Sequence, residues 1–150
     1  MKIYPDTSFL CALYVQQSHS SRAIAYMERL GSPLESTSLL FFEFRQSLQF
    51  QVFRHSKDRA QGYGLRVAQA ASAALQSDVK SGIYRHAAVD WAEVHQIGER
   101  IALHSTAKEG HRGFDILHVA TALHLGAREF LTFDGQQKRL ALAEGLTVPF

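Results

Sequence analysis

The chain alternates short apolar runs with longer segments in which apolar residues recur at helical spacing. The short runs are typical of buried β-strands. They lie at Lys2 to Pro5, Leu34 to Thr37, Glu129 to Phe133 and Leu146 to Val148. The first run is followed at once by Asp6-Thr7-Ser8, whose side chains cap helices well. A strand that turns directly into a helix is therefore predicted at the start of the chain.

Further segments are predicted to be helical. Besides the one after Asp6, they run from about Ser20 to Leu30, from Ser38 onward, from Lys57 to Leu75, from Asp90 to Ala107, from Phe114 to Leu125 and from Gln136 to Ala143. The segment that begins at Phe114 is nearly all apolar, so we expect it to be buried on most sides. Gly126 is expected to end it. The stretch from Ser77 to His86 has no clear pattern.

Short strands alternating with helices predict an α/β fold of three layers, in which helices flank a short central parallel sheet. The 150 residues are most simply one domain, residues 1–150. In such sheets, sites form beyond the carboxyl ends of the strands. Asp6 and Asp134 each follow a predicted strand directly. Both are therefore expected at the same edge of the fold.

Composition narrows the class of protein. With 46% hydrophobic and 20% charged residues, the chain reads as an ordinary globular protein. No apolar stretch reaches the roughly 20 residues that a membrane-spanning helix needs, and no signal peptide is apparent. Cys11 is the only cysteine, which excludes an internal disulfide and a thiolate zinc site. A reducing cytoplasm and no contact with a membrane are the expectations.

Charge is distributed unevenly, although the net charge is only +2. Basic residues dominate the middle of the chain, where the acids are Asp58 and Asp78. The bases of this region are Arg45, Arg54, Lys57, Arg59, Arg66 and Lys80. This pattern favours a phosphate-bearing partner, and charge alone allows an ordinary solvated helix face equally well.

Acidic residues interrupt apolar segments at four places where a charge has little structural use: Asp6, Glu43, Asp115 and Asp134. A buried ionised carboxylate is costly unless a positive group neutralises it. Brought together, these four would repel one another and favour a divalent cation. Hard oxygen ligands select Mg²⁺ or Mn²⁺. The sequence thus predicts a metal site.

Each acid also has a simpler explanation. Asp6, Asp115 and Asp134 each precede or begin a helix, where an aspartate can act as an N-cap. Glu43 can be an exposed residue favoured by the helix dipole. Capping and metal binding are compatible, however, and four coincidences of this kind are less expected than one.

The same residues carry a family resemblance. Asp6-Thr7-Ser8-Phe9-Leu10 after a strand, Glu43 on the third helix, the segment Phe114 to Leu123, and Phe130 to Asp134 closely resemble the PIN-domain ribonucleases. More narrowly, they are similar to the VapC toxins of bacterial type II toxin–antitoxin systems. The order and spacing of these motifs cover essentially the whole chain.

The resemblance implies a PIN-like fold and a Mg²⁺- or Mn²⁺-dependent endoribonuclease. Asp6, Asp115 and Asp134 would be metal ligands, and Glu43 would complete the catalytic cluster by binding metal or orienting the attacking water. The family also implies a homodimer, an RNA substrate and a separately encoded antitoxin that holds the toxin inactive.

Neighbouring polar residues have secondary interpretations. Thr7, Ser8 and Thr132 are candidates for orienting the carboxylates, against ordinary capping and strand chemistry. Arg45 and Arg112 lie near the acids in sequence and are candidate substrate contacts, against simple exposure. His118 shares a helix face with Asp115, and we expect a hydrogen-bonded core histidine there.

Other classes of function compete with the nuclease. A non-catalytic module would bind RNA or a partner protein through the basic region, without any need for four acids. A DNA-directed nuclease of related architecture would use the same site. A phospho-acceptor receiver domain also places aspartates at strand ends, but acids on helices, such as Glu43, fit it poorly.

Overall fold

Parallel strands form the centre of the protein in a computed structural model that describes residues 1–150. β1 (Ile3–Pro5) pairs with β4 (Glu129–Leu131), with Ile3 opposite Glu129. β2 (Leu34–Ser36) pairs in the same parallel sense with β3 (Tyr84–His86). β1 and β2 lie next to each other, so the two pairs stand side by side as one short parallel layer.

Seven helices surround these strands. They are α1 (Thr7–Tyr14), α2 (Ser20–Arg29), α3 (Ser38–Lys57), α4 (Leu65–Lys80), α5 (Trp91–Glu109), α6 (Gly113–His124) and α7 (Gly135–Ala143). Side chains cap many of their first turns: Asp6, Thr37, Asp90 and Asp134 each accept a hydrogen bond from a backbone amide of the helix that follows.

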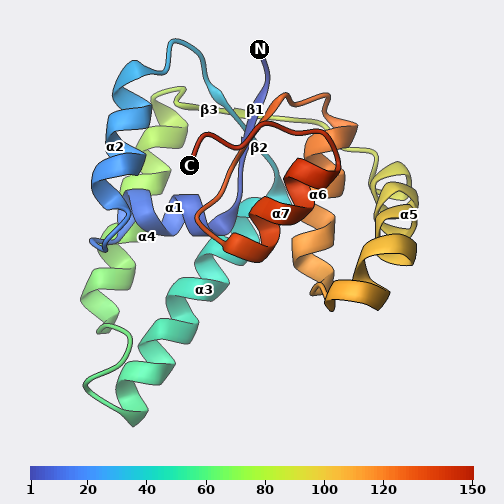
Figure 1. The fold of residues 1–150 in the computed structure, drawn as a ribbon. Helices are drawn as coiled ribbons and strands as arrows, with labels where there is room; N and C mark the ends of the chain where they lie inside the picture. Colours follow the sequence, from blue (N-terminus) through green and yellow to red (C-terminus); the bar gives the residue numbers. More distant parts are fainter.

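The helices form two groups, one on each side of the strands (Figure 1). α1 packs against α2, α3 and α4, whereas α6 packs against α5 and α7. The expected three-layer α/β/α arrangement is therefore confirmed. None of the helices combines the length and hydrophobicity that crossing a bilayer requires.

The hydrophobic core joins the strands to both groups of helices. Its largest fully buried side chains include Tyr4, Phe9, Phe44 and Phe130. α6 is the central helix: seven of its residues are buried, as its continuous apolar sequence predicted. Gly126 ends this helix region with a left-handed φ of 68°, again as expected.

Two predicted elements are wrong. The helix expected from Lys57 to Leu75 begins only at Leu65, because α3 continues to Lys57 and residues 58–64 form the connection. The strand expected from Leu146 to Val148 is reduced to a single bridge between Thr147 and Glu129. Smaller differences concern strand ends, since β4 stops at Leu131 instead of Phe133.

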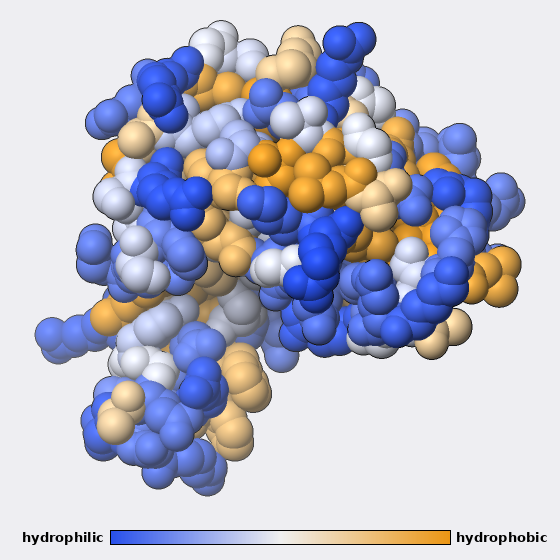
Figure 2. Space-filling model, in the orientation of Figure 1, coloured by the Kyte–Doolittle hydropathy of each residue, from blue (hydrophilic) through white to orange (hydrophobic).

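α3 and α4 form a helical hairpin whose tip projects from the body of the molecule (Figure 1). The projecting end is mainly hydrophilic and carries a few apolar residues (Figure 2). Phe50 and Phe53 are more than half exposed on α3, and their rings stack with centroids 6.3 Å apart. The hairpin also holds Arg54 and Lys57 of the basic middle region.

Candidate active site

Asp6 lies immediately after β1 and is only 1% exposed. Its Oδ1 accepts hydrogen bonds from the Ser8 hydroxyl (2.6 Å) and the Phe9 amide (3.0 Å). Its Oδ2 accepts one from the Thr132 hydroxyl (2.5 Å). Burial raises the pKa of Asp6 from 3.8 to about 6, and these hydrogen bonds offset only part of that effect. A positive neighbour would restore the ionised form.

Glu43 lies on α3 and is held by a buried histidine from α6. His118 is 1% exposed and its Nε2 lies 2.5 Å from Glu43 Oε2. Its Nδ1 lies 3.1 Å from the Tyr4 hydroxyl, and the Thr7 hydroxyl donates to the same Glu43 oxygen. Burial opposes ionisation of Glu43, but His118 and Thr7 outweigh it and hold the pKa of Glu43 below its usual range.

Asp115 and Asp134 are joined by one arginine. Arg112 Nε donates to Asp115 Oδ2 at 2.9 Å, and Arg112 Nη2 lies 3.9 Å from Asp134 Oδ2. Asp115 is 5% exposed in the first turn of α6. Asp134 caps α7 by accepting from the Gln137 amide, and the Gln137 side chain donates to the Asp115 carbonyl at 3.2 Å. This arrangement ties the starts of α6 and α7 together.

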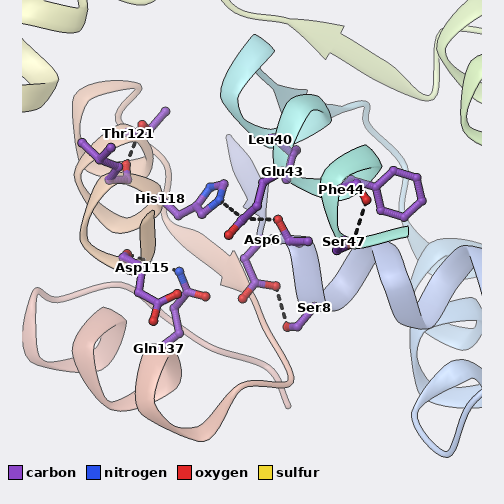
Figure 3. A network of polar contacts seen from close by, with 12 residues as sticks. Asp6, Ser8, Leu40, Glu43, Phe44, Ser47, Asp115, His118, Thr121 and Gln137 are labelled. Carbon is purple, nitrogen blue, oxygen red and sulfur yellow. Dashed lines mark hydrogen bonds and ion pairs between the residues drawn. The ribbon is translucent and has the colours of Figure 1, made fainter. Parts of the chain in front are cut away.

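The parallel pairing of β1 and β4 brings these groups to one edge of the strands. The Asp6 amide donates to the Leu131 carbonyl at 2.9 Å, so Asp6 and Thr132 leave their strands side by side. Figure 3 shows Asp6, Glu43 and Asp115 converging from β1, α3 and α6. Asp134 joins them through Thr132, whose hydroxyl accepts a hydrogen bond from the Asp134 amide at 3.0 Å.

The acids surround a common space without forming a closed coordination shell. No three acidic, imidazole or thiol groups are close enough together for one ion to be bound by all of them. Arg112 supplies the local counter-charge, and its side chain is 72% exposed. The donors are all carboxylate oxygens, which suits Mg²⁺ or Mn²⁺. The Asp115 side chain is only 7% exposed, so if Arg112 moves away, this carboxylate needs another cation in its place.

The candidate orienting residues all contact an acid. Thr7 bonds to Glu43, whereas Ser8 and Thr132 bond to Asp6. Arg112 contacts two of the acids, and Arg45 instead lies over the Phe41 ring, 5.8 Å from its centroid. Their roles in catalysis or substrate binding remain predictions.

Sequence reasoning missed the partner of His118. A hydrogen-bonded buried histidine was expected, and the structure has one, but its partners are the site residue Glu43 and Tyr4. Tyr4 lies inside an apolar strand with nothing to distinguish it from a core aromatic. The His118 spacing to Asp115 did place it on the correct helix face.

Comparison with known proteins identifies the family. The model of the PIN domain family matches residues 3–142, almost the whole chain. The chain belongs to the PIN domain family. That family is one of hydrolytic nucleases, so the acidic edge of this PIN domain is its candidate active site.

A solved structure supports the same fold. VapC20 of Mycobacterium tuberculosis, described as a toxin that cleaves the sarcin–ricin loop, superimposes on this PIN domain with a TM-score of 0.66. The identity is 20%, and the match covers 97% of each chain. At this identity the likeness concerns the fold. No curated protein matches the sequence.

Proposed function

We propose that this PIN domain is a Mg²⁺- or Mn²⁺-dependent endoribonuclease and the toxin of a toxin–antitoxin pair. The observation that carries the proposal is the burial of acids at the carboxyl edge of parallel strands. Asp6 and Asp115 are 1% and 5% exposed, with Glu43 and Asp134 beside them. Buried ionised carboxylates destabilise a protein unless a cation neutralises them. Their presence at this edge therefore supports a bound metal ion.

Asp6, Asp115 and Asp134 would hold the metal, some of them directly and others through water molecules that the ion retains. When bound, the ion supplies a water of lowered pKa and neutralises charge that develops on the phosphate. The residues of the chain provide the remaining functions. Ser8 and Thr132 fix both oxygens of Asp6, and Gln137 fixes the backbone of Asp115. A carboxylate whose orientation is already fixed loses little conformational entropy when it binds a metal ion.

Glu43 is the candidate for orienting the attacking water. Both His118 and Thr7 bond to Oε2 of Glu43. These contacts fix the orientation of the carboxylate and favour its ionised form. An ionised carboxylate accepts a proton from water, as a general base does. Arg112 lies next to Asp115 and Asp134. Once the metal has replaced it at these acids, its guanidinium is placed to bind the substrate phosphate.

The toxin role rests on the family and on the likeness to VapC20. We propose that the protein acts in the cytoplasm as a homodimer, that its substrate is RNA, and that a cognate antitoxin protein keeps it inactive. A short gene for a DNA-binding protein next to its own gene would support this role. Co-expression with that partner would then restore growth of cells that the PIN domain alone arrests.

Single-turnover cleavage of structured RNA tests the enzymatic proposal. We expect cleavage with Mg²⁺ or Mn²⁺, none with chelator, and losses of at least about 100-fold in Asp6→Asn and Asp115→Asn. Glu99→Gln on α5 is the matched control, since it removes an exposed acid far along another helix. Equal cleavage by wild type and the two aspartate variants would refute the proposed site.

The same assay separates the alternatives. RNA binding that is unaffected by chelator, with no scission, would instead establish a non-catalytic binding module. Preferential cleavage of DNA in substrate competition would redirect the proposal to a DNA nuclease.

A further inference from the structure

We propose that a cavity formed by His19, Arg22, Phe133 and Lys138 binds one nucleotide of the RNA, next to the bond that is cleaved. The inference rests on the proposed function and adds to it a subsite for the base and phosphate of a flanking nucleotide.

The cavity opens directly beside the candidate active site. Its volume is about 180 Å³, and it lies between the start of α2, the β4–α7 connection and Phe150. Thr132 and Asp134, which contact or belong to the acidic cluster, form part of its wall. A nucleotide in this cavity would therefore be continuous with a phosphodiester at the acids.

One cation in the cavity, Arg22, has no acidic partner. Arg22 forms no ion pair, and its Cζ lies 5.5 Å from the ring centroids of both Phe133 and Phe150. Lys138 donates to the main-chain oxygen of Phe150, the last residue of the sequence, so its ammonium group is already engaged. Arg112 at the acids is likewise already paired with Asp115. The charge of Arg22 thus remains available to a phosphate.

A flat aromatic surface lies next to Arg22. The His19 ring is stacked on Phe133, with centroids 4.5 Å apart and planes within 4° of parallel. Phe9 and Phe150 pack against Phe133 in turn, at 6.0 and 4.6 Å. This stack fixes the ring of His19, which is only partly buried. Its outer face offers a platform on which a base can stack.

Charge and ring surface together favour a nucleotide over a free anion. Asp134 in the cavity wall repels a small phosphate, since its side chain is 35% exposed. A nucleotide gains additional binding energy from its base, because an uncharged base that stacks on His19 is not repelled by Asp134. The combination of a guanidinium and an aromatic face is also how single-stranded RNA is held in other proteins.

Nuclear magnetic resonance with mononucleotides tests the subsite without any cleavage. In chelator-containing buffer, uridine and adenosine 5′-monophosphate should shift the signals of His19, Arg22 and Lys138 in the wild-type protein. Arg22→Ala should weaken this binding, whereas Arg29→Ala, a basic change at the other end of α2, should not. Inorganic phosphate should bind more weakly. Shifts elsewhere, none at all, or equal binding of phosphate would overturn the subsite.

Cleavage of abasic RNA tests which nucleotide the cavity holds. Removing one base next to the cleaved bond should lower kcat/KM of the wild type by about tenfold, as the loss of one base stack does. His19→Ala should lose a similar factor on intact RNA and show no further loss on the abasic substrate. An undiminished abasic penalty in His19→Ala would refute the platform. If nucleotides bind in the cavity but RNA is not cleaved, the proposed function fails and the binding site stands.

Discussion

At the scale of single residues, Asp6 shows that a fold can keep a group that weakens it. Burial raises the pKa of this carboxyl to about 6, so the metal-free protein at neutral pH contains a charge that prefers water. Three hydrogen-bond donors, from Ser8, Phe9 and Thr132, reduce the cost without removing it. This is the energetic pattern of a residue retained for binding.

Replacing Asp6 by Asn should therefore stabilise the metal-free protein. The pKa is higher in the folded than in the unfolded state, so stability from Asp6 is fully present below about 3.8 and is lost as pH rises through about 6. The difference of roughly two units corresponds to about 3 kcal/mol near neutral pH as an upper value. Denaturant unfolding in chelator should show Asp6→Asn more stable than wild type, and the difference should shrink as the solution is acidified.

Divalent metal should reverse this order, because an ion that binds the carboxylate stabilises only the wild type. An Asp6→Asn variant that is less stable at neutral pH without metal, or a difference independent of pH, would contradict the argument.

His118 should act as a positioning residue for Glu43. We expect His118→Leu to lower kcat by about 10- to 100-fold with little change in KM, which is typical when a supporting contact is lost. His118→Gln should recover part of the activity, since its amide can still donate toward Glu43. Single-turnover kinetics, with circular dichroism to confirm folding, measure both effects.

Tyr4→Phe is the matched control for this pair of variants. It removes the hydroxyl on the far side of the His118 ring and leaves the bond to Glu43 in place. Its effect should be smaller than that of His118→Leu. A larger effect in Tyr4→Phe, or full activity in His118→Leu, would show that Glu43 is held by other means.

At the scale of elements, local chemistry predicted most boundaries. Asp6 and Asp134 were expected to cap helices, and each does so through a side-chain bond to a backbone amide, as Asp90 also does. Asp115, the other candidate cap, instead lies in the first turn of α6, whose N-cap is Arg112. Capping depends only on neighbours in sequence, which explains why it can be read without a structure. The apolar segment from Phe114 was equally clear, because a helix buried on most sides is nearly all apolar in sequence.

The predicted boundaries were wrong where tertiary contacts determine the end of an element. α3 ends at Lys57, where no glycine or proline marks the end of a helix in the sequence. The alanine-rich sequence that follows therefore suggested that the next helix begins earlier than Leu65. The last strand is reduced to one bridge, between Thr147 and Glu129, although β4 continues to Leu131. Neither outcome is determined by the residues of the segment alone.

The candidate site divides in the same way. The two aspartates that follow strands could be assigned to one edge from topology. The contact of His118 with Glu43 joins α6 to α3 across 75 positions in sequence. No local pattern could pair these two side chains, because their meeting depends on how two helix groups pack over the strands.

The α3–α4 hairpin should depend on Gly62. This residue has a φ of +58°, and a Cβ added there would lie 2.0 Å from the carbonyl oxygen of Gln51. Gly62→Ala therefore forces the connection away from α3 and should lower the free energy of unfolding by about 1–3 kcal/mol. Gly64→Ala is the control, since its nearest neighbour is a His55 side-chain atom at 4.0 Å. Thermal unfolding of the two variants should differ clearly, and equal melting temperatures would contradict a constrained turn.

At the scale of the whole molecule, basic residues from several helices are arranged around the acidic cluster. Basic residues lie along α3 and α4, whereas Arg22 and Lys138 approach the acids from α2 and α7. The net charge of +2 conceals this separation. When a metal neutralises the acidic edge, the surroundings of the site become more positive still, which suits a polyanion whose backbone spans several elements.

Salt dependence should reveal how many of these cations meet RNA phosphates. Binding of single-stranded RNA to the Asp115→Asn variant, which keeps the surface and should not cleave, is expected to weaken steeply with salt. Each lost phosphate contact lowers the slope of log affinity against log salt by about 0.7. Arg22→Ala and Arg45→Ala should each produce that change, and the double variant should add both, because the two residues lie on different helices. Arg29→Ala should leave the slope unchanged. If all three single variants reduce the slope equally, binding depends on overall charge alone and the RNA has no defined path past the acids.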